Sequence, residues 1–248
     1  MNIGALLHFL FAFLTKTIPA FFAQPAAPNG PIADRPGHID RIATLAAKME
    51  SRTIAIGPLP RTGGVVHLVS KENAANVASI IVEAADRYQE DEALIAALID
   101  GESRGDAQAI NPNLQLAQPG ESTHASMSHT DYGLEQEDGA TALGNPRFSG
   151  LSDAEIIGRL LSPIYGVDFV CSTLQRNLDW AHRLLTQEPA LASAVPTGLD
   201  AIEVIGCNAY NAGPTGTKTS LHSTKPNLAY GIGVVTKAND WRALLDAR

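Results

Sequence analysis

The chain has 248 residues, of which 45% are hydrophobic and 18% charged, and its formal net charge is -8. This composition is that of an ordinary globular protein, and the length allows a sizeable buried core. The acidic balance argues against a nucleic-acid partner, because nucleic-acid surfaces usually carry a basic excess. It does not exclude a neutral or peptide-bearing polymer as substrate.

The first 23 residues have the composition of an export signal or a membrane anchor. Ile3–Leu14 is an apolar run of twelve residues, which suits the core of a signal peptide better than a full membrane span. No Lys or Arg precedes this run and no A-x-A cleavage site follows it. An uncleaved anchor over Ile3–Ala23 and a buried helix of a soluble protein therefore stay open. We expect export to the periplasm or cell envelope, with membrane contact if the segment is retained.

A linker, a short extension and one large domain are expected behind this segment. A stretch rich in Pro, Ala and Gly indicates the linker. The extension, whose role the sequence does not show, is predicted to hold an amphipathic helix over Ile39–Met49 and a small β-hairpin of Thr53–Ile56 with Val65–Val69. The expected boundaries are residues 24–38 for the linker, 39–70 for the extension and 71–248 for the domain.

Helical periodicity dominates from Glu72 onward, so the expected fold class is mainly α. The last strong helical pattern ends at Gly213-Pro214, a stop signal. Asn111–Gly150 has few apolar residues and many Gly, Pro, Ser, Thr and His, which predicts one long loop. The predicted helices span residues 77–88, 94–101, 153–161, 167–185 and 200–212, with a terminal helix around Trp241.

A single glutamate ends the most apolar of these helices. Leu94, Ile95, Leu98, Ile99 and Glu102 fall on one stripe, because they lie at positions i, i+1, i+4, i+5 and i+8. Loss of hydration on such a face disfavours the charged carboxylate and raises its pKa. A carboxyl that stays protonated near neutral pH can act as a general acid. A lone Glu at a frayed helix end would be solvated instead, so the hypothesis depends on the motifs that follow.

Three separated motifs follow one another in a set order. They are Glu102-Ser103, Gly133-Leu134-Glu135-Gln136 and Ala209-Tyr210-Asn211-Ala212-Gly213. Together they resemble the lytic transglycosylases of the Slt type, whose catalytic domain has a lysozyme-like fold. Leu160–Leu178 also looks like the family's helix between the last two motifs. The resemblance covers roughly Val77 to Gly216.

The resemblance implies an enzyme that acts on peptidoglycan without a cofactor or metal. Such enzymes cleave the β-1,4 bond from N-acetylmuramic acid to N-acetylglucosamine and leave a 1,6-anhydro end. By motif position Glu102 would be the sole acid and base, and Ser103 would orient its carboxyl or the substrate N-acetyl group. Gln136 would hydrogen-bond the glycan, Tyr210 would hold the orientation of Glu102, and Asn211 would tie the late helix to the loop.

The loop between the first two motifs departs from the family pattern. Gln136 lies 34 positions after Glu102, which is longer than usual, so Leu114–Ser128 is expected to be an insertion. The insertion region brings His124 and His129 close in sequence. No second ligand pair at metal spacing accompanies them, so no zinc site is predicted.

Glu135 stands where the family commonly has Met or another apolar residue. We expect its side chain to be solvent-exposed, since charged side chains usually are. If it lay near Glu102 it would raise the pKa of that acid by like-charge repulsion, or act as the second carboxylate of a hydrolase.

Two alternatives to the transglycosylase hypothesis stay open. A lysozyme-type peptidoglycan hydrolase would leave reducing ends instead of anhydro ends. A non-catalytic lysozyme-like scaffold would have no chemical need for Glu102. In every case the expected partner is the glycan strands of peptidoglycan, in the setting of wall turnover, a secretion apparatus or a phage particle.

A less favoured alternative comes from Gly101–Gly105, which matches G-x-S-x-G. Ser103 would then be the nucleophile of an α/β-hydrolase, with His222 or His182 as its base. That motif must follow a buried strand, whereas Ala93–Ile99 has helical period and no Val, Thr or aromatic residue.

The two cysteines, Cys171 and Cys207, lie on two predicted helices that flank the core. In an exported protein they could form one disulfide, whereas as free thiols they would be small core residues.

Overall fold

The computed structural model describes residues 38–50, 71–107, 109–112, 116 and 122–246. The chain divides into two units, Met1–Pro31 and Ile32–Arg248, and every described residue belongs to the second. The expected export segment, most of the linker and the expected hairpin of residues 53–69 lie outside the described residues. Among the helices that are described, none is both long enough and apolar enough to span a membrane.

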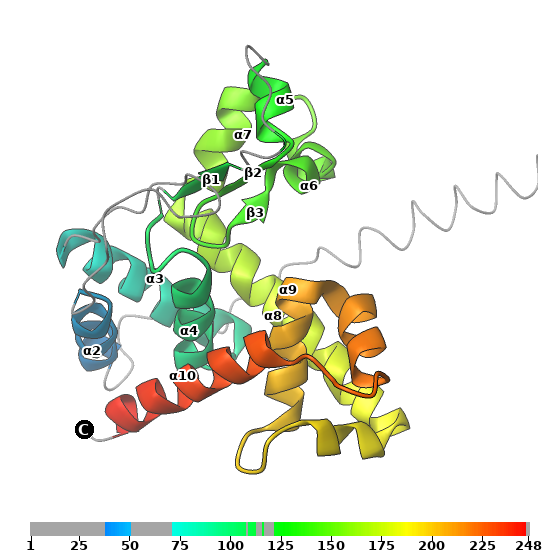
Figure 1. Cartoon of the computed structure of the whole chain (residues 1–248). Helices are drawn as coiled ribbons and strands as arrows, with labels where there is room; N and C mark the ends of the chain where they lie inside the picture. The colour runs from blue at the N-terminus through cyan, green and yellow to red at the C-terminus, as the bar shows by residue number, and fades with distance from the viewer. Residues whose placement is uncertain (1–37, 51–70, 108, 113–115, 117–121, 247–248) are drawn as a thin grey trace, which may run out of the picture. The chain divides into compact units, whose positions relative to one another are not determined.

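The fold is mainly α-helical with one small antiparallel sheet, ordered β1-β2-β3 (Figure 1). The elements in chain order are α2 (His38–Glu50), α3 (Lys71–Tyr88), α4 (Glu92–Glu102), β1 (Ile110–Pro112), α5 (Thr123–Met127), β2 (Thr130–Tyr132), β3 (Glu137–Asp138), α6 (Gly139–Leu143), η2 (Pro146–Phe148), α7 (Asp153–Leu160), α8 (Pro163–Gln187), η3 (Pro189–Ala194), α9 (Ala201–Leu221) and α10 (Ala229–Asp246).

The predicted helices are confirmed, and most of them extend beyond their predicted bounds. The prediction that the helix ends at Gly213-Pro214 is only partly confirmed. Gly213 leaves the helical region, with φ 69° and ψ 159°, but Pro214 then starts a further helical stretch to Leu221. Proline fits this first position because its missing N–H would have had no partner there.

The prediction of one long loop over 111–150 is wrong for the described part of that region. It holds the sheet and three short helical segments. The strands have only two or three residues, too few for an alternating pattern to show in the sequence. The helices of five residues begin at caps, where Ser122 and Asp138 accept hydrogen bonds from backbone N–H groups.

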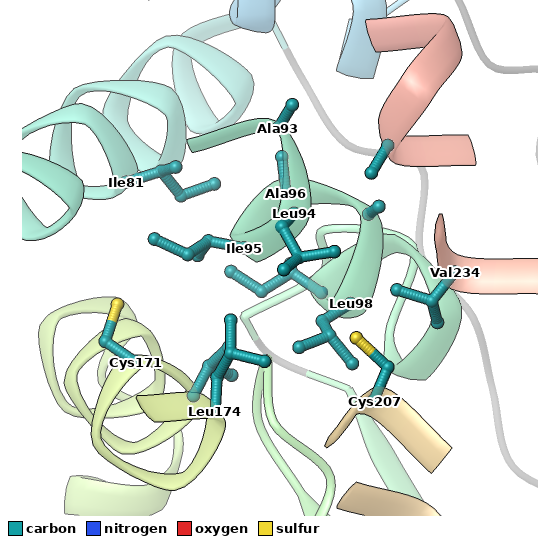
Figure 2. Close-up of a cluster of buried hydrophobic side chains, with 14 of the residues drawn as sticks. Ile81, Ala93, Leu94, Ile95, Ala96, Leu98, Cys171, Leu174, Cys207 and Val234 are labelled. Atoms are coloured by element: carbon teal, nitrogen blue, oxygen red, sulfur yellow. The ribbon is translucent and has the colours of Figure 1, made fainter. Parts of the chain in front are cut away.

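Helix α4 lies at the centre of the main hydrophobic core, in contact with α3, α8 and α10. All eight of its residues from Ala93 to Asp100 are buried. Figure 2 shows its Leu94, Ile95 and Leu98 among side chains of the neighbouring helices. A helix that is apolar on every side is stable only inside such a core.

Both cysteines are free buried thiols in this core. Of the two alternatives left open by the sequence, the structure therefore has the free thiols and not the disulfide. Burial is the main factor that raises the pKa of each thiol. Their sulfur atoms are drawn in Figure 2.

A second, smaller hydrophobic cluster lies around the sheet. Its buried members come from the sheet, from α5 to α7 and from the segment between α6 and α7: Met127, Tyr132, Ala142, Phe148, Ile156 and Leu160. Tyr165, near the start of α8, packs against this cluster, while later residues of the same helix belong to the main core. Helix α8 therefore connects the sheet region to the main core.

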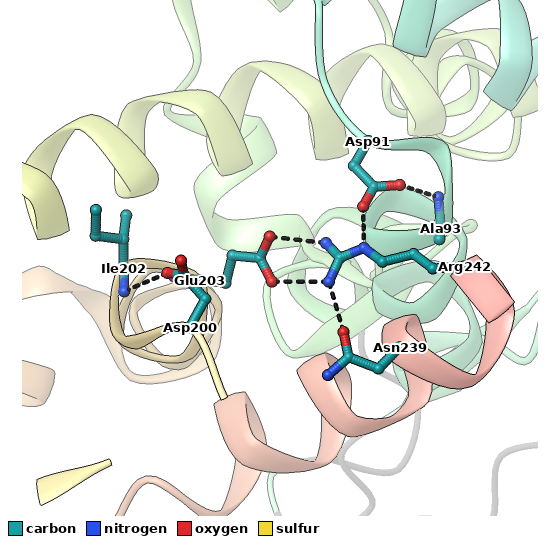
Figure 3. A network of polar contacts seen from close by, with 7 residues as sticks. All are labelled: Asp91, Ala93, Asp200, Ile202, Glu203, Asn239 and Arg242. Carbon is teal, nitrogen blue, oxygen red and sulfur yellow. Dashed lines mark hydrogen bonds and ion pairs between the residues drawn. The ribbon is translucent and has the colours of Figure 1, made fainter. Parts of the chain in front are cut away.

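Helix α10 is fastened to α4 by polar contacts as well as by packing. Lys237 donates to the buried carboxylate of Asp100. Near the other end of α4, Arg242 donates to Asp91 and to both carboxylate oxygens of Glu203 on α9 (Figure 3). Asp91 also caps α4, because its other oxygen accepts from the Ala93 N–H. One guanidinium thus holds three helices together.

We expect Arg242→Met to lower the free energy of unfolding by about 1–2 kcal/mol, because it removes charge-assisted hydrogen bonds at a partly buried site. Methionine keeps the apolar stem of the side chain. Urea unfolding followed by circular dichroism measures the change. Arg183→Met, at an exposed position of α8, is the control, and equal effects of the two substitutions would contradict the role given to Arg242.

Candidate functional site

Glu102 is the last residue of α4, and its side chain is largely but not completely buried. Burial is the main factor that raises its pKa. A hydrogen bond from Tyr230 acts in the opposite direction, and the negative charge of Asp131 adds to the increase. The end of a buried helix therefore presents a carboxyl whose pKa lies above the ordinary value of a glutamate.

The hydrogen-bond donor to Glu102 is Tyr230, whose phenol O–H points to Oε1 of the carboxylate. Tyr230 lies in the first turn of α10, 128 positions later in the chain. Burial, followed by the charge of Glu102, raises the pKa of this phenol, so it stays a donor. The sequence analysis missed this residue, because no motif surrounds it and a contact over that separation leaves no local pattern.

Ser103 directly follows the helix and is buried. Its Oγ donates to the carbonyl oxygen of Ile99 at 3.2 Å, and its backbone N–H donates to the same oxygen. The hydroxyl therefore completes the last turn of α4. The chain then turns away through Arg104 and Gly105, both with positive φ. The predicted role of Ser103 toward the carboxyl or the substrate stays a prediction.

The segment Gly133–Gln136 forms the turn between β2 and β3. Gly133 has φ 77°, its N–H donates to Ala109 O at 2.9 Å, and an added Cβ would overlap the carbonyl of Leu160. Only glycine fits such a position without strain. The Gln136 side-chain amide donates to Gly133 O at 2.9 Å. Gln136 thus closes the turn, and its predicted contact with a glycan stays a prediction.

Tyr210 on α9 lies between the first two motifs. Its O–H donates to the backbone carbonyl of Glu135 at 3.5 Å. Burial first, and then the negative charges of Glu102, Glu135 and Glu137, raise its pKa well above the ordinary value. The structure therefore brings the tyrosine of the third motif together with the acid of the first and the turn of the second.

Asn211, the next residue, is exposed, and no hydrogen bond from its side chain reaches the described part of the loop. A different asparagine stabilises this helix. The buried Asn208 side chain donates to Thr217 Oγ1 at 3.2 Å. This bond connects the two halves of α9 across the Gly213 kink.

The expectation that Glu135 is exposed is wrong, because its side chain is 2% exposed. Neither carboxyl oxygen has a hydrogen-bond partner among the described residues, and an added Cβ at Gly166 would overlap Oε2. Burial, together with the charge of Glu137, raises the pKa of Glu135 to about 9. At neutral pH this glutamate is a neutral, enclosed acid, so the prediction of exposure, which assumed a charged side chain, failed.

Asp131 on β2 is a partly exposed carboxylate next to this turn. In the strand register it lies opposite Asn111 of β1 and Asp138 of β3. Partial burial and the charge of Asp138 raise its pKa to about 6. It is therefore ionised at neutral pH.

The α/β-hydrolase alternative lacks its structural context in the described part of the chain. Ser103 follows a helix, and the described sheet is antiparallel with three short strands. His222 pairs with Glu188 at 3.1 Å, not with Ser103. His124 lies 3.0 Å from Asp153, and the described residues contain no group of three or more His, Cys, Asp or Glu that could hold a metal ion.

An open groove of about 600 Å³ lies elsewhere, between α8 and the second half of α9. It is lined by Trp180, Pro214, Thr215, Lys218, Thr219 and His222. None of the residues of the three motifs lines it. Its Lys218 and His222 are both paired with Glu188.

Comparison with known proteins gives no match for this chain among protein-family models, curated proteins or solved structures.

We expect Tyr230→Phe to raise the pKa of Glu102, because the hydrogen bond that favours its ionised form is lost while burial stays. NMR titration of 13C-labelled glutamate carboxyl groups measures the shift. Tyr165→Phe, which removes the donor to Glu137 instead, is the matched control. An unchanged titration midpoint for Glu102 in the Tyr230 variant would show that the phenol does not control this carboxyl.

We expect Glu135→Gln to stabilise the protein increasingly as pH rises. The folded-state pKa of Glu135, about 9, lies above its ordinary value of 4.5. Between these two values the folded chain keeps a proton that the unfolded chain has released, so the wild type loses stability as pH increases, by up to about 1.4 kcal/mol per pH unit.

Urea unfolding of both proteins at pH 5, 7 and 8.5 tests this expectation. The difference in free energy of unfolding should be smallest at pH 5 and grow in favour of Glu135→Gln. A difference that stays constant over this range would mean that Glu135 does not hold its proton in the folded protein.

Proposed function

We propose that residues 71–248 form a lysozyme-like catalytic domain that acts as a peptidoglycan lytic transglycosylase of the Slt type. The observation that carries the proposal is the meeting of three motifs that the sequence keeps apart. Glu102 ends a buried helix, Tyr210 is subject to its charge, and the same tyrosine contacts the turn Gly133–Gln136. This meeting supports the resemblance on which the proposal is based.

The proposed reaction needs one carboxyl that first gives a proton and then takes one back. Protonated Glu102 donates to the glycosidic oxygen as the bond from that oxygen to C1 of N-acetylmuramic acid breaks. The departing N-acetylglucosamine leaves with a free 4-hydroxyl. The 6-hydroxyl oxygen of the muramic acid then attacks C1, and its proton passes to the Glu102 carboxylate. The acid is restored, a 1,6-anhydro end is formed, and no water is consumed.

Two observations support Glu102 in this role. Burial raises its pKa, which increases the protonated fraction near neutral pH. Tyr230 donates a hydrogen bond to one oxygen of the carboxyl and thereby restricts its orientation, as the proposed role requires.

A lysozyme-type hydrolysis is the second candidate. It is favoured by the presence of Asp131, a second carboxylate whose charge acts on Glu102. In that reaction water attacks C1 and leaves a reducing end. The same proposal includes export to the periplasm or cell envelope. It also includes activity beside a secretion apparatus or in a phage particle.

Mass spectrometry of muropeptides from purified peptidoglycan tests the proposal. We expect the wild-type chain to release anhydromuramyl products and Glu102→Gln to lose at least about 100-fold in rate, since general acid catalysis is worth about 10²–10⁴. Glu83→Gln on α3, which makes the same chemical change outside the motifs, should keep full activity. Reducing-end products would establish hydrolysis, and no products from the folded wild type would leave the scaffold hypothesis.

A further inference from the structure

The groove between α8 and the second half of α9 has no part in the proposed cleavage. The two helices pack against each other (Figure 1). Helix α8 contributes Trp180 to the lining of the groove. The lining residues from α9 are spaced four apart in two adjacent rows: Pro214, Thr215, Lys218, Thr219 and His222. Residues four apart lie on one face of a helix, so this half of α9 presents a single continuous face to the groove.

Trp180 brings to this groove an aromatic ring that the fold covers only in part. The side chain packs against the main core and stays half-buried. Within the described part of the chain, neither its indole N–H nor the Thr215 hydroxyl makes a hydrogen bond. An aromatic surface beside a few free polar groups is the usual lining of a small-molecule site.

The basic groups of the groove are already paired, which selects against a charged ligand. Glu188, directly after α8, lies 2.9 Å from the Lys218 ammonium and 3.1 Å from His222 Nε2. A phosphate or an acidic peptide would have to break these contacts to bind the same groups. A neutral ligand with an apolar ring face and hydroxyl groups leaves them intact.

The sugar rings of an acetylated glycan have this chemistry. The C–H face of a pyranose ring packs on an indole ring, while its hydroxyl and N-acetyl groups hydrogen-bond donors and acceptors such as the indole N–H and the Thr215 hydroxyl. The groove volume of about 600 Å³ lies within the range of ligand sites. Because the groove is open, a strand can continue beyond it.

Helix α9 connects this groove firmly to the proposed cleavage site. Its first half carries Tyr210, and its second half carries the groove face. The two halves are joined across the Gly213 kink by the 3.2 Å hydrogen bond from Asn208 to Thr217. Thr217 and Leu221 are buried, so the second half is anchored by one face and leaves the other to the groove.

We propose that this groove is a second, non-catalytic binding site for the sugar rings of a glycan strand, with Trp180 as the stacking surface and Thr215 as a hydrogen-bonding group. That the strand is peptidoglycan rests on the proposed function, whereas the binding of acetylated sugars does not. A strand held in the groove stays on the domain after a cleavage, which raises the effective concentration of its next bonds at Glu102.

The test is an NMR titration of the 15N-labelled full chain with chitotetraose, a tetramer of N-acetylglucosamine. This sugar lacks the muramic acid that the proposed cleavage needs, so binding is observed without reaction. The chain has two tryptophans, and Trp241 is 2% exposed. We expect the indole N–H signal of Trp180 to shift in a saturable manner while that of Trp241 stays unchanged.

Matched variants locate the bound sugar. Thr215→Arg puts a long charged side chain into the groove from an exposed position and should weaken binding at least about tenfold. Thr123→Arg makes the same change at an exposed position of α5, outside the groove, and should bind as the wild type does. Trp180→Phe assigns the indole signal by removing it, and through-space contacts assign the signal in the wild type if that variant does not fold.

The outcomes separate this proposal from the proposed function. At about 10 mM chitotetraose, well above a weak millimolar dissociation constant, an unchanged Trp180 signal would overturn the groove as a sugar site, even if the chain releases muropeptides. Undiminished binding by a folded Thr215→Arg would overturn it as well. A chain that binds chitotetraose at Trp180 but releases no muropeptides would overturn the proposed cleavage and leave the sugar site standing.

Discussion

The burial of α4 from Ala93 to Asp100 is the constraint on which the rest of the structure depends. From Ala93 to Asp100 no residue of this helix faces solvent, so each polar group in it or at its ends needs a partner from another element. Helix α10 supplies these partners. It runs antiparallel to α4, so residues progressively earlier in α10 contact residues progressively later in α4. Arg242 reaches Asp91, Lys237 reaches Asp100, and Tyr230 reaches Glu102. The contacts that stabilise the core are therefore also the contacts that fix the candidate acid.

Burial is the main factor that raises the pKa of three carboxyl groups around this site. Glu135 is enclosed beside Gly133 and Gly166 and keeps its proton up to a pKa of about 9. Asp131, on a partly exposed strand face, has a pKa of about 6. For Glu102, burial and the Asp131 charge both raise the pKa. Placement in the fold alone thus gives neighbouring acids different chemical capacities.

The sequence predicts what depends on long, regular patterns and misses what depends on distant contacts. The helices have enough turns for their periodicity to show, and Gly213 marks its own kink. The strands are too short to alternate visibly. The contact of Tyr230 with Glu102 joins positions 128 residues apart, which no local pattern encodes. The prediction that Glu135 is exposed was wrong because it assumed a charged side chain. An enclosed glutamate is neutral and packs like an apolar residue.

A second carboxylate does not by itself turn a transglycosylase into a hydrolase. In both candidate reactions the sugar passes through a state with positive charge near C1, whichever oxygen attacks. The products differ only in whether the attacking oxygen comes from the 6-hydroxyl or from water. In the proposed reaction Glu102 could receive the proton of either one, because it would be a carboxylate once the glycosidic bond has broken. Under the proposed function, the outcome therefore depends on which oxygen reaches C1 first.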